Sequence, residues 1–307
     1  MTLNPALDKT VTIPAFAVGG VNRIERMRLD PGGKGINVSK VIAALGGRSI
    51  AMGILGGAAG RYIKTCLDDM GIENDFVFVR EETRTNLKII DPERRTNTDI
   101  NDRGMPASGR TMRRMLDRLK ARVISGDTVV LAGKAPPGVS EEIYLDWGAQ
   151  LKSLGVKVCM DADGPLLFHG IKAGPEIIKP NEEEFSRLVG KQLASLEEIA
   201  RAAVELNRRG TGQIAVSMGE KGALFVRDGR ALYAHGLRVP VKSTVGAGDA
   251  TMAAMVLGEE RGESWEDTIR LAIAAGAASV MCEGTEAASA KVVQELIQQV
   301  NMEEFIL

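Results

Sequence analysis

The segment from Ser243 to Ala250 reads Ser-Thr-Val-Gly-Ala-Gly-Asp-Ala and combines a glycine turn with a carboxylate. The glycines allow a tight turn whose N–H groups point at a ligand, and the small residues that follow predict a buried helix. The N-terminus of such a helix attracts anions, and Asp249 beside it is suited to accept a proton while the amides bind phosphate charge. The segment predicts a phosphoryl-transfer site. An aspartate that only caps the helix is the structural alternative.

A second glycine cluster, Gly-Gly-Lys-Gly-Ile-Asn-Val from Gly32 to Val38, opens another predicted helix. Its glycines permit close approach of the backbone to a ligand, and Lys34 can contact a phosphate or a hydroxyl group. A turn with an exposed lysine is the alternative. The cluster lacks the spacing of a Walker A loop, and the glycines from Gly53 to Gly60 lack that of a dinucleotide fingerprint.

Two further segments place polar residues where a predicted strand ends. Asn181 has the position of a helix N-cap and Glu184 completes a capping box, but at the carboxyl end of a strand the same pair suits a magnesium ion held through water. In residues 216–222 a strand enters a glycine turn that suits the phosphates or ribose of a nucleotide. A plain hairpin explains that turn equally well.

The composition limits the classes of partner. The chain has 307 residues, 44% of them hydrophobic, and a formal net charge of -1. It offers no overall field for nucleic acid or an anionic membrane, and we expect neither as a partner. Three separated cysteines predict reduced core thiols, and two histidines exclude a histidine-rich metal site. With no membrane-length apolar stretch and no signal peptide, we expect a soluble, cytoplasmic protein.

Short apolar runs alternate with amphipathic stretches, which predicts an α/β fold with a mostly parallel sheet covered on both faces. We expect strands near residues 49–54, 75–79, 128–132, 156–161, 176–179 and 213–218. We expect helices near residues 36–45, 61–70, 111–123, 141–154, 182–189, 196–208, 249–261, 265–282 and 290–300. The last three follow one another, and one face of them should pack on the sheet.

Two polar, β-prone segments interrupt this alternation, at residues 9–13 and 83–101. Strands inserted in an α/β core are a candidate lid, because lids exclude water during group transfer. A surface hairpin without function is the alternative. We expect lid strands at about residues 8–14 and 83–102, in a single domain that spans residues 1–307.

Four motifs follow one another along almost the whole chain. They are Asn-Pro-Ala-Leu-Asp at 4–8, Gly-Gly-Lys-Gly-Ile-Asn-Val at 32–38, Lys-Pro-Asn-Glu-Glu-Glu at 179–184 and Thr-Val-Gly-Ala-Gly-Asp at 244–249. In this order they resemble the PfkB (ribokinase-like) sugar kinases, and within that family most of all the 1-phosphofructokinases, with the tagatose-6-phosphate kinases next. The resemblance implies a three-layer α/β/α core with a small β lid.

The resemblance also implies roles for the matching residues around the nucleotide. Asp249 would be the general base that deprotonates a sugar hydroxyl, and the anion hole for the γ-phosphate of ATP would be formed by the amides of Gly246, Ala247 and Gly248. Mg²⁺ would be organised, mainly through water, by Asn181 and Glu184. The turn beside the nucleotide would be formed by Ser217 and Gly219, with Gly222 shaping it.

On the sugar side the resemblance implies a pocket below the lid. Asp8 would bind sugar hydroxyls with Asn4 beside it, and Arg84 would hold the phosphate that the substrate already carries. The remaining pocket residues would be Gly33, Lys34, Asn37 and Lys134. The lid, with its exposed strand edges, could also pair with a second copy of the chain to form a homodimer.

The chain departs from the family pattern at three places. Lys134 replaces a serine that contacts sugar or phosphate in relatives, so it adds charge to the pocket or crowds it. Asp-Ala-Asp-Gly at 161–164 differs from the commoner Asp-Thr-Ser-Gly. Relatives also have several residues before the position of Thr2, so either the start lies upstream or one strand of the sheet is shortened.

The implied reaction is ATP-dependent phosphorylation of a phosphorylated ketohexose, from fructose 1-phosphate to fructose 1,6-bisphosphate. Ser-Thr-Val-Gly-Ala at 243–247 favours this acceptor over tagatose 6-phosphate, for which Asn-Pro-Val-Gly-Ser is more usual. A relative that binds a sugar phosphate without turning it over is the alternative from another class, and Lys134 is the residue that supports it.

Overall fold

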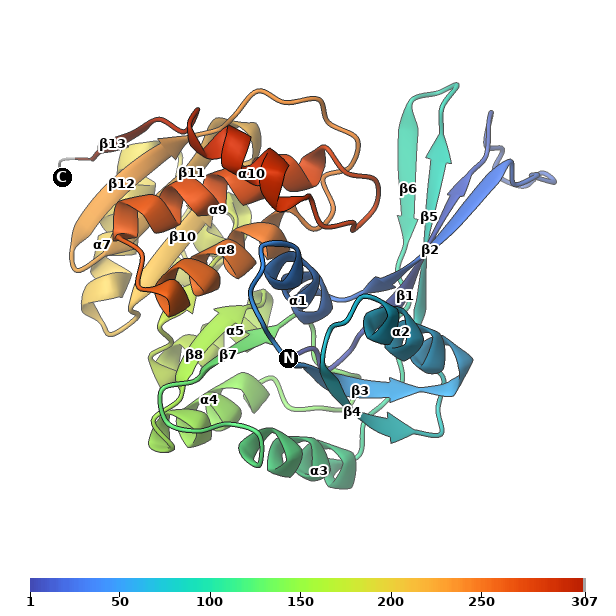
Figure 1. Cartoon of the computed structure of the whole chain (residues 1–307), viewed down its shortest axis with the longest axis horizontal. Helices are drawn as coiled ribbons and strands as arrows, with labels where there is room; N and C mark the ends of the chain where they lie inside the picture. Colours follow the sequence, from blue (N-terminus) through green and yellow to red (C-terminus); the bar gives the residue numbers. More distant parts are fainter. Residues whose placement is uncertain (306–307) are drawn as a thin grey trace.

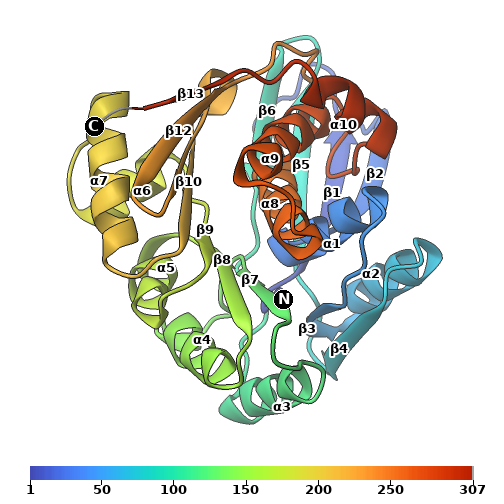
Figure 2. The same ribbon diagram turned by 60° about the vertical axis from the view of Figure 1, so that its left-hand side comes forward.

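The structure, a computed structural model, describes residues 1–305 and has helices on both faces of a central β-sheet. A separate small sheet projects from one edge of this core, as Figures 1 and 2 show. The predicted three-layer α/β/α fold with a β lid is confirmed. The assignment of the whole chain to one kinase domain stays a prediction.

The central sheet has a parallel core that continues into antiparallel strands. The parallel strands are β3 (Ala51–Gly56), β4 (Asn74–Val79), β7 (Thr128–Ala132), β8 (Lys157–Asp161), β9 (Ile177–Ile178) and β10 (Gln213–Ser217). The antiparallel strands that follow are β11 (Gly222–Arg227), β12 (Arg230–His235) and β13 (Met302–Glu304). The carboxyl ends of the parallel strands meet at one edge, where α/β proteins bind ligands.

Neighbouring residues of each central strand point to opposite faces, so both faces bury apolar side chains under helices. One face is covered by α3 (Gly109–Lys120), α4 (Ile143–Ser153), α5 (Gly164–Gly170), α6 (Glu182–Val189) and α7 (Leu196–Arg208). The other is covered by α1 (Lys34–Ala44), α2 (Gly57–Asp69), α8 (Ala247–Arg261), α9 (Trp265–Val280) and α10 (Ala290–Ile297).

The lid is a four-stranded sheet in the order β2-β1-β5-β6. Its strands are β1 (Ala6–Thr12), β2 (Arg26–Gly32), β5 (Thr85–Asp91) and β6 (Thr96–Ile100). β2 leads directly into the glycine cluster that opens α1, so the lid is joined to this helix without an intervening loop. A small apolar cluster of Val11, Ile13 and Ile89 holds the lid strands together.

The first residues of the chain lie between the two sets of parallel strands. Thr2 forms single parallel bridges to Gly53 of β3 and Ala132 of β7. The α-amino group of Met1 is buried and donates a hydrogen bond to the carbonyl of Val130 at 2.9 Å. This segment joins β3 to β7 through one paired residue on each side.

The sequence analysis missed β2, α5, β11, β12 and β13, whereas the elements it predicted lie within a few residues of those observed. The β11–β12 hairpin had a signal, because Asp228-Gly229 lies between two apolar runs and both residues have positive φ, 50° and 76°, as a type I′ turn requires. β2 is charged and contains a proline, so it lacks the apolar alternation of a strand. Only pairing with β1 across the loop of residues 13–25 makes it one.

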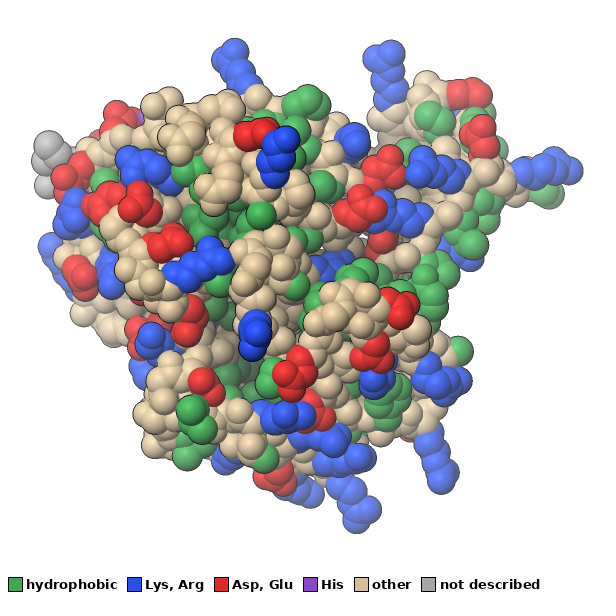
Figure 3. All heavy atoms as spheres, viewed as in Figure 1, with side chains coloured by type: hydrophobic (Ala, Val, Ile, Leu, Met, Phe, Trp, Pro, Cys, Tyr) green, Lys and Arg blue, Asp and Glu red, His purple; other side chains and the backbone are tan. Residues whose placement is uncertain are grey.

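Charged side chains of both signs are spread over the face shown in Figure 3, in keeping with a formal net charge of -1. Within residues 1–305 there is no helix that is both long and apolar enough to cross a membrane. The thiols of Cys66, Cys159 and Cys282 are free, but only Cys159 is buried in the core as expected, whereas Cys66 and Cys282 are half-buried. The cytoplasmic location stays a prediction.

Candidate active site

A cavity of about 570 Å³ lies between the lid and the carboxyl ends of the parallel strands. Most of the residues singled out in the sequence line this cavity: Asn4, Asp8, Gly33, Lys34, Asn37, Arg84, Lys134, Asn181, Glu184, Ser217, Gly246, Gly248 and Asp249. They come from the lid and the segments beside it, from the starts of α1, α6 and α8, and from the ends of β7, β9 and β10. The fold therefore brings together positions that are far apart in the chain.

Asp249 lies in the first turn of α8 and faces this cavity. The residue before the helix, Gly246, has a φ of 86°, a left-handed conformation that favours glycine. Asp249 is only 6% exposed, and its Oδ2 accepts a hydrogen bond from Nδ2 of Asn37 at 2.8 Å. Asn37 belongs to α1. A carboxylate that only capped its own helix would instead accept hydrogen bonds from the first-turn amides of α8.

The surroundings of Asp249 suit a proton acceptor. Burial, with the negative charge of Asp161 added to it, raises the pKa of the Asp249 carboxyl to about 6. The first-turn amides of α8 have no acceptors within the helix and attract anions. A carboxyl with this pKa beside such amides can take a proton from a hydroxyl group while the amides bind a negatively charged group.

Beneath this turn, the carboxylate of Asp161 is held between two lysines. Asp161 ends β8 and is 1% exposed; its Oδ1 is 2.7 Å from Nζ of Lys34 and its Oδ2 is 3.5 Å from Nζ of Lys179. Burial alone would raise the pKa of Asp161, but the charges of Lys179 and Lys34 outweigh burial and lower it. The three groups together carry a positive charge, which suits a ligand that bears phosphate.

Asn181 and Glu184 form the capping box expected at the start of α6. Asn181 Oδ1 accepts from the Glu184 amide at 2.8 Å, and Glu184 Oε2 accepts from the Asn181 amide at 2.9 Å. Both side chains also line the cavity, and Glu184 Oε1 takes no part in the box. The structural and the metal interpretation are therefore compatible, because Mg²⁺ needs few protein oxygens and keeps water in its shell.

Three of the predicted residues, Ala247, Gly219 and Gly222, are absent from the cavity lining. Ala247 contributes its backbone to the first turn of α8. Gly219 begins a short 3-10 turn after Ser217. Gly222 has a φ of 114°, and a Cβ there would lie 2.1 Å from the carbonyl of Ala234, so a glycine is required for β11 to pair with β12.

The lid side of the cavity is organised by hydrogen bonds. Asp8 Oδ1 accepts from Nδ2 of Asn86 at 2.8 Å, and burial raises the pKa of Asp8. The guanidinium of Arg84 donates to the carbonyls of Asn4 at 2.9 Å and Asp102 at 2.9 Å. Asn4 Nδ2 donates to the carbonyl of Arg103 at 2.9 Å. These contacts hold the guanidinium of Arg84 in one orientation at the cavity wall.

Three buried polar atoms of the cavity wall have no hydrogen-bond partner among the described residues: Thr2 Oγ1, Asn37 Oδ1 and Asn86 Oδ1. Buried polar atoms are normally paired, so unpaired atoms gathered in one cavity indicate that a polar ligand or water completes them. Lys134, at the carboxyl end of β7, adds an exposed ammonium group to the same wall.

The comparisons with known proteins agree with this geometry. The model of the pfkB family carbohydrate kinases matches residues 1–291. This chain belongs to the PfkB family. It is 36% identical to a 1-phosphofructokinase of Rhodobacter capsulatus over 89% of this chain and 87% of the relative. It is 35% identical to a 1-phosphofructokinase of Haemophilus influenzae over 98% of this chain and 96% of the relative.

The solved structures most similar to this PfkB kinase include phosphofructokinase-2 from Escherichia coli in complex with potassium. That structure has a TM-score of 0.93, with 30% sequence identity over 97% of both chains. A possible 1-phosphofructokinase from Thermotoga maritima has a TM-score of 0.88, with 27% identity over 99% of this chain and 98% of the other. The predicted sugar-phosphate kinase class is confirmed by this membership.

The sequence analysis gave no site role to some residues that line the cavity of this PfkB kinase. Asp161 and Lys179 lay within quoted motifs, and an aspartate at the carboxyl end of a buried strand is a recognisable signal. No such sequence signal marked Asn86, Asp30 or Thr285. Their side chains reach the cavity only because the lid strands pair and a distant loop packs against them.

Proposed function

We propose that this protein transfers the γ-phosphoryl group of ATP to a hydroxyl group of fructose 1-phosphate, giving fructose 1,6-bisphosphate. The observation that carries the proposal is the buried carboxyl of Asp249, with its pKa raised to about 6, in a cavity shared with Lys34, Arg84 and Lys134. The relatives named as 1-phosphofructokinases support this acceptor.

In the proposed reaction Asp249 takes the proton of the acceptor hydroxyl, and the oxygen forms a bond to the γ-phosphorus. The bond from that phosphorus to the oxygen that bridges the β- and γ-phosphates breaks, and ADP leaves with the electron pair. The amides of Gly246, Ala247 and Gly248 bind the charge on the transferred group. Asn37 holds the Asp249 carboxylate in position.

ATP is assigned to the side of the cavity at Ser217, beside the turn that contains Gly219 and Gly222. Asn181 and Glu184 are suited to hold Mg²⁺ through water, because both line the cavity and the capping box uses only Oε2 of Glu184. When bound, the metal ion supplies positive charge to the phosphates. Lys34 and Lys179 supply further positive charge from below.

The sugar phosphate is assigned to the lid side. Asp8 and Asn4 are suited to bind its hydroxyl groups. Gly33 lines the same cavity, and a glycine is required there because a Cβ would lie 2.9 Å from the side chain of Thr2. The guanidinium of Arg84 is suited to the phosphate of the acceptor, and Lys134 lines the same cavity. The lid then excludes water from the transfer.

A coupled assay of ADP release tests this proposal with fructose 1-phosphate, fructose 6-phosphate and tagatose 6-phosphate as acceptors. We expect the highest kcat/KM with fructose 1-phosphate. A preference for tagatose 6-phosphate would reassign the acceptor but keep the chemistry. If none of the three is turned over while one still raises Tm, the protein is a sugar-phosphate-binding relative without kinase activity.

The activity should depend on pH with an inflection near 6. A general base works only when deprotonated, and the pKa of Asp249 is raised from 3.8 to about 6. We therefore expect kcat/KM to be constant from pH 7 upward to about 8 and to fall about tenfold per unit below pH 6. Initial rates at saturating ATP measure this profile. An inflection near pH 4 would contradict the assignment of Asp249 as the base.

We also propose that two copies of the chain pair through the lid. β2 and β6 are its edge strands, and apolar side chains are exposed along β2 and the loop before it: Val18, Val21, Ile24 and Met27. A tetrameric inhibited form is known for phosphofructokinase-2 from Escherichia coli, a structural relative.

Light scattering should give the mass of a dimer for the unchanged protein and of a monomer for the variant Ile24→Asp with Met27→Asp. Ile124→Asp is the matched control, because Ile124 is 73% exposed outside the lid. A monomer before any substitution, or a dimer that survives the double substitution, would exclude this interface.

A further inference from the structure

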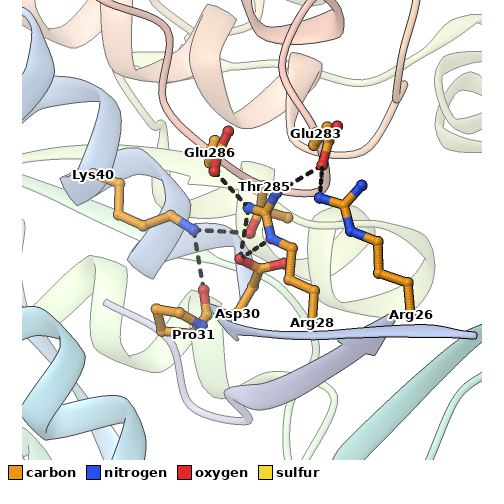
Figure 4. Close-up of polar contacts among 8 residues, drawn as sticks. All are labelled: Arg26, Arg28, Asp30, Pro31, Lys40, Glu283, Thr285 and Glu286. Carbon is orange, nitrogen blue, oxygen red and sulfur yellow. Dashed lines mark hydrogen bonds and ion pairs between the residues drawn. The ribbon is translucent and has the colours of Figure 1, made fainter. Parts of the chain in front are cut away.

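A network of charged groups connects the lid to the loop of residues 281–289, which joins α9 to α10 (Figure 4). Arg28 of β2 donates to Asp30 Oδ1 through Nε at 2.9 Å and Nη2 at 2.8 Å. The same guanidinium lies 3.2 Å from Glu286 and 3.7 Å from Glu283. Arg26 adds a second contact to Glu283 at 3.2 Å.

Arg28 and Asp30 are not an ordinary surface pair. Their side chains are 22% and 12% exposed, and Asp30 lies directly opposite Asp8 in the pairing of β2 with β1. The loop passes so close that a Cβ at Gly284 would lie 2.8 Å from Asp30 Oδ2. Asp30, Gly284 and Thr285 all line the cavity, so the network forms part of its wall.

Lys40 of α1 binds the same loop by a hydrogen bond. Its Nζ donates to Thr285 Oγ1 at 2.8 Å and to the carbonyl of Pro31 at 3.0 Å, as Figure 4 shows. Lys40 is 7% exposed, and burial lowers its pKa to about 8. Burying an ammonium group against two neutral acceptors is unfavourable for stability, which argues for a role in positioning.

The loop in turn is continuous with the segment that leads to Asp249. The carbonyl of Val280, at the end of α9, accepts from the amides of Lys242 at 2.8 Å and Ser243 at 3.2 Å. A Cβ at Gly246 would lie 3.8 Å from Ser279 Oγ. An unbroken series of contacts therefore runs from β2 through residues 281–286 and the end of α9 to the turn before α8.

We propose that Arg28 and Lys40 are positioning residues, which hold β2 and the loop of residues 281–286 together so that the lid and the turn at Ser243–Asp249 adopt their reactive arrangement jointly. The sugar side and the phosphoryl-transfer side are thereby coupled, and each ligand improves the affinity for the other by the same factor. This coupling of affinities rests on the proposed function. The mechanical connection, by which we mean the contacts that join β2 to the loop and to Ser243–Asp249, does not.

The mechanical connection is tested without ligand by hydrogen exchange in Arg28→Met. We expect faster exchange in β2, in residues 281–287 and also at the amides of Lys242 and Ser243, which Arg28 does not touch. The matched control is Arg118→Met, which removes an ion pair of 2.8 Å to Asp75 far from the cavity. Unchanged exchange at Lys242 and Ser243 would overturn the proposal, whatever the protein phosphorylates.

The coupling is tested by the dissociation constant of a non-hydrolysable ATP analogue with and without fructose 1-phosphate. We expect the sugar phosphate to tighten analogue binding at least fivefold, and Arg28→Met and Glu286→Gln each to reduce this factor to below twofold. The double variant should lose no more than Arg28→Met, because both residues belong to one contact. Arg28→Lys should restore part of the factor.

A second variant covers the case in which Arg28→Met does not fold. Lys40→Met keeps most of the length of the side chain and removes its two hydrogen bonds, and we expect a lower kcat with a nearly unchanged KM for the sugar phosphate. The coupling would be overturned if fructose 1-phosphate tightened binding of the ATP analogue by the same factor in the variants and in the unchanged protein. If the unchanged protein does not bind fructose 1-phosphate, the proposed acceptor is refuted. The hydrogen-exchange result for Arg28→Met then decides whether β2, the loop and Ser243 are connected.

Discussion

Asp249→Asn is expected to lower kcat by about 10²–10⁴-fold, the usual contribution of a general base, while the KM for the sugar phosphate changes only a few fold. The amide has nearly the shape of the carboxyl and can keep a contact to Asn37, but it cannot accept the proton of the acceptor hydroxyl. The anion hole formed by the first turn of α8 remains, so residual turnover from positioning is expected. Steady-state kinetics and single-turnover rates measure the loss.

The same substitution should make the protein more stable. Burial raises the pKa of Asp249 from 3.8 to about 6, so the charged form is disfavoured in the folded state, and this cost is fully present above pH 6 and disappears as the pH falls below 4. A raised pKa of this size corresponds to a few kcal/mol. We expect Asp249→Asn to raise the free energy of unfolding at pH 7 by about 1–3 kcal/mol, measured by urea denaturation.

Asp228→Asn is the matched control, because it makes the same change on the exposed β11–β12 turn. It should leave both kcat and stability close to their original values. A kcat for Asp249→Asn that is comparable to that of the unchanged protein would refute the assignment of the base. A lower stability together with lost turnover would instead mean that the substitution disturbs the fold.

Arg84→Ala is expected to raise the KM for the sugar phosphate by about 10–100-fold and the KM for ATP less than threefold. Hydrogen bonds to a charged group contribute roughly 1.5–3 kcal/mol, and Arg84 reaches only one of the two ligands in the proposed arrangement. The carbonyls of Asn4 and Asp102 already orient its guanidinium, so little entropy is lost when a phosphate binds.

Arg84→Lys separates charge from geometry, because lysine keeps the positive charge but cannot make the paired hydrogen bonds of a guanidinium. An intermediate KM is expected. Arg80 is an exposed arginine between β4 and β5 that does not line the cavity, and Arg80→Ala should change neither KM. Equal increases in both KM values for Arg84→Ala would show a general loss of lid structure and count against a phosphate contact.

Some parts of the site were predictable because the local sequence alone determines the conformation of short segments. The turn at Gly246 needs a left-handed residue before a helix, and the capping box of Asn181 and Glu184 follows from spacing alone. The apolar strands β7, β8 and β10 were predicted for a similar reason, since strands buried on both faces are continuous apolar runs.

Other parts depend on partners distant in the chain. β2 is charged and contains Pro31, and it becomes a strand only because β1 supplies its hydrogen bonds. The pKa of Asp249 depends on Asp161, Lys34 and Asn37, which come from other elements. No local pattern could indicate that Arg28 meets Glu283 and Glu286.

The amino-acid sequence by itself determined the family and the α/β class and predicted the reacting groups, because glycine turns, helix caps and apolar periodicity are local properties of the chain. The tertiary structure decided where those groups lie: the burial and the raised pKa of the Asp249 carboxyl, the two lysines around Asp161 and the connection of the lid to residues 281–286. Burial and charge–charge interactions depend on distances in space, and these exist only once the lid, the sheet and the helices have packed together.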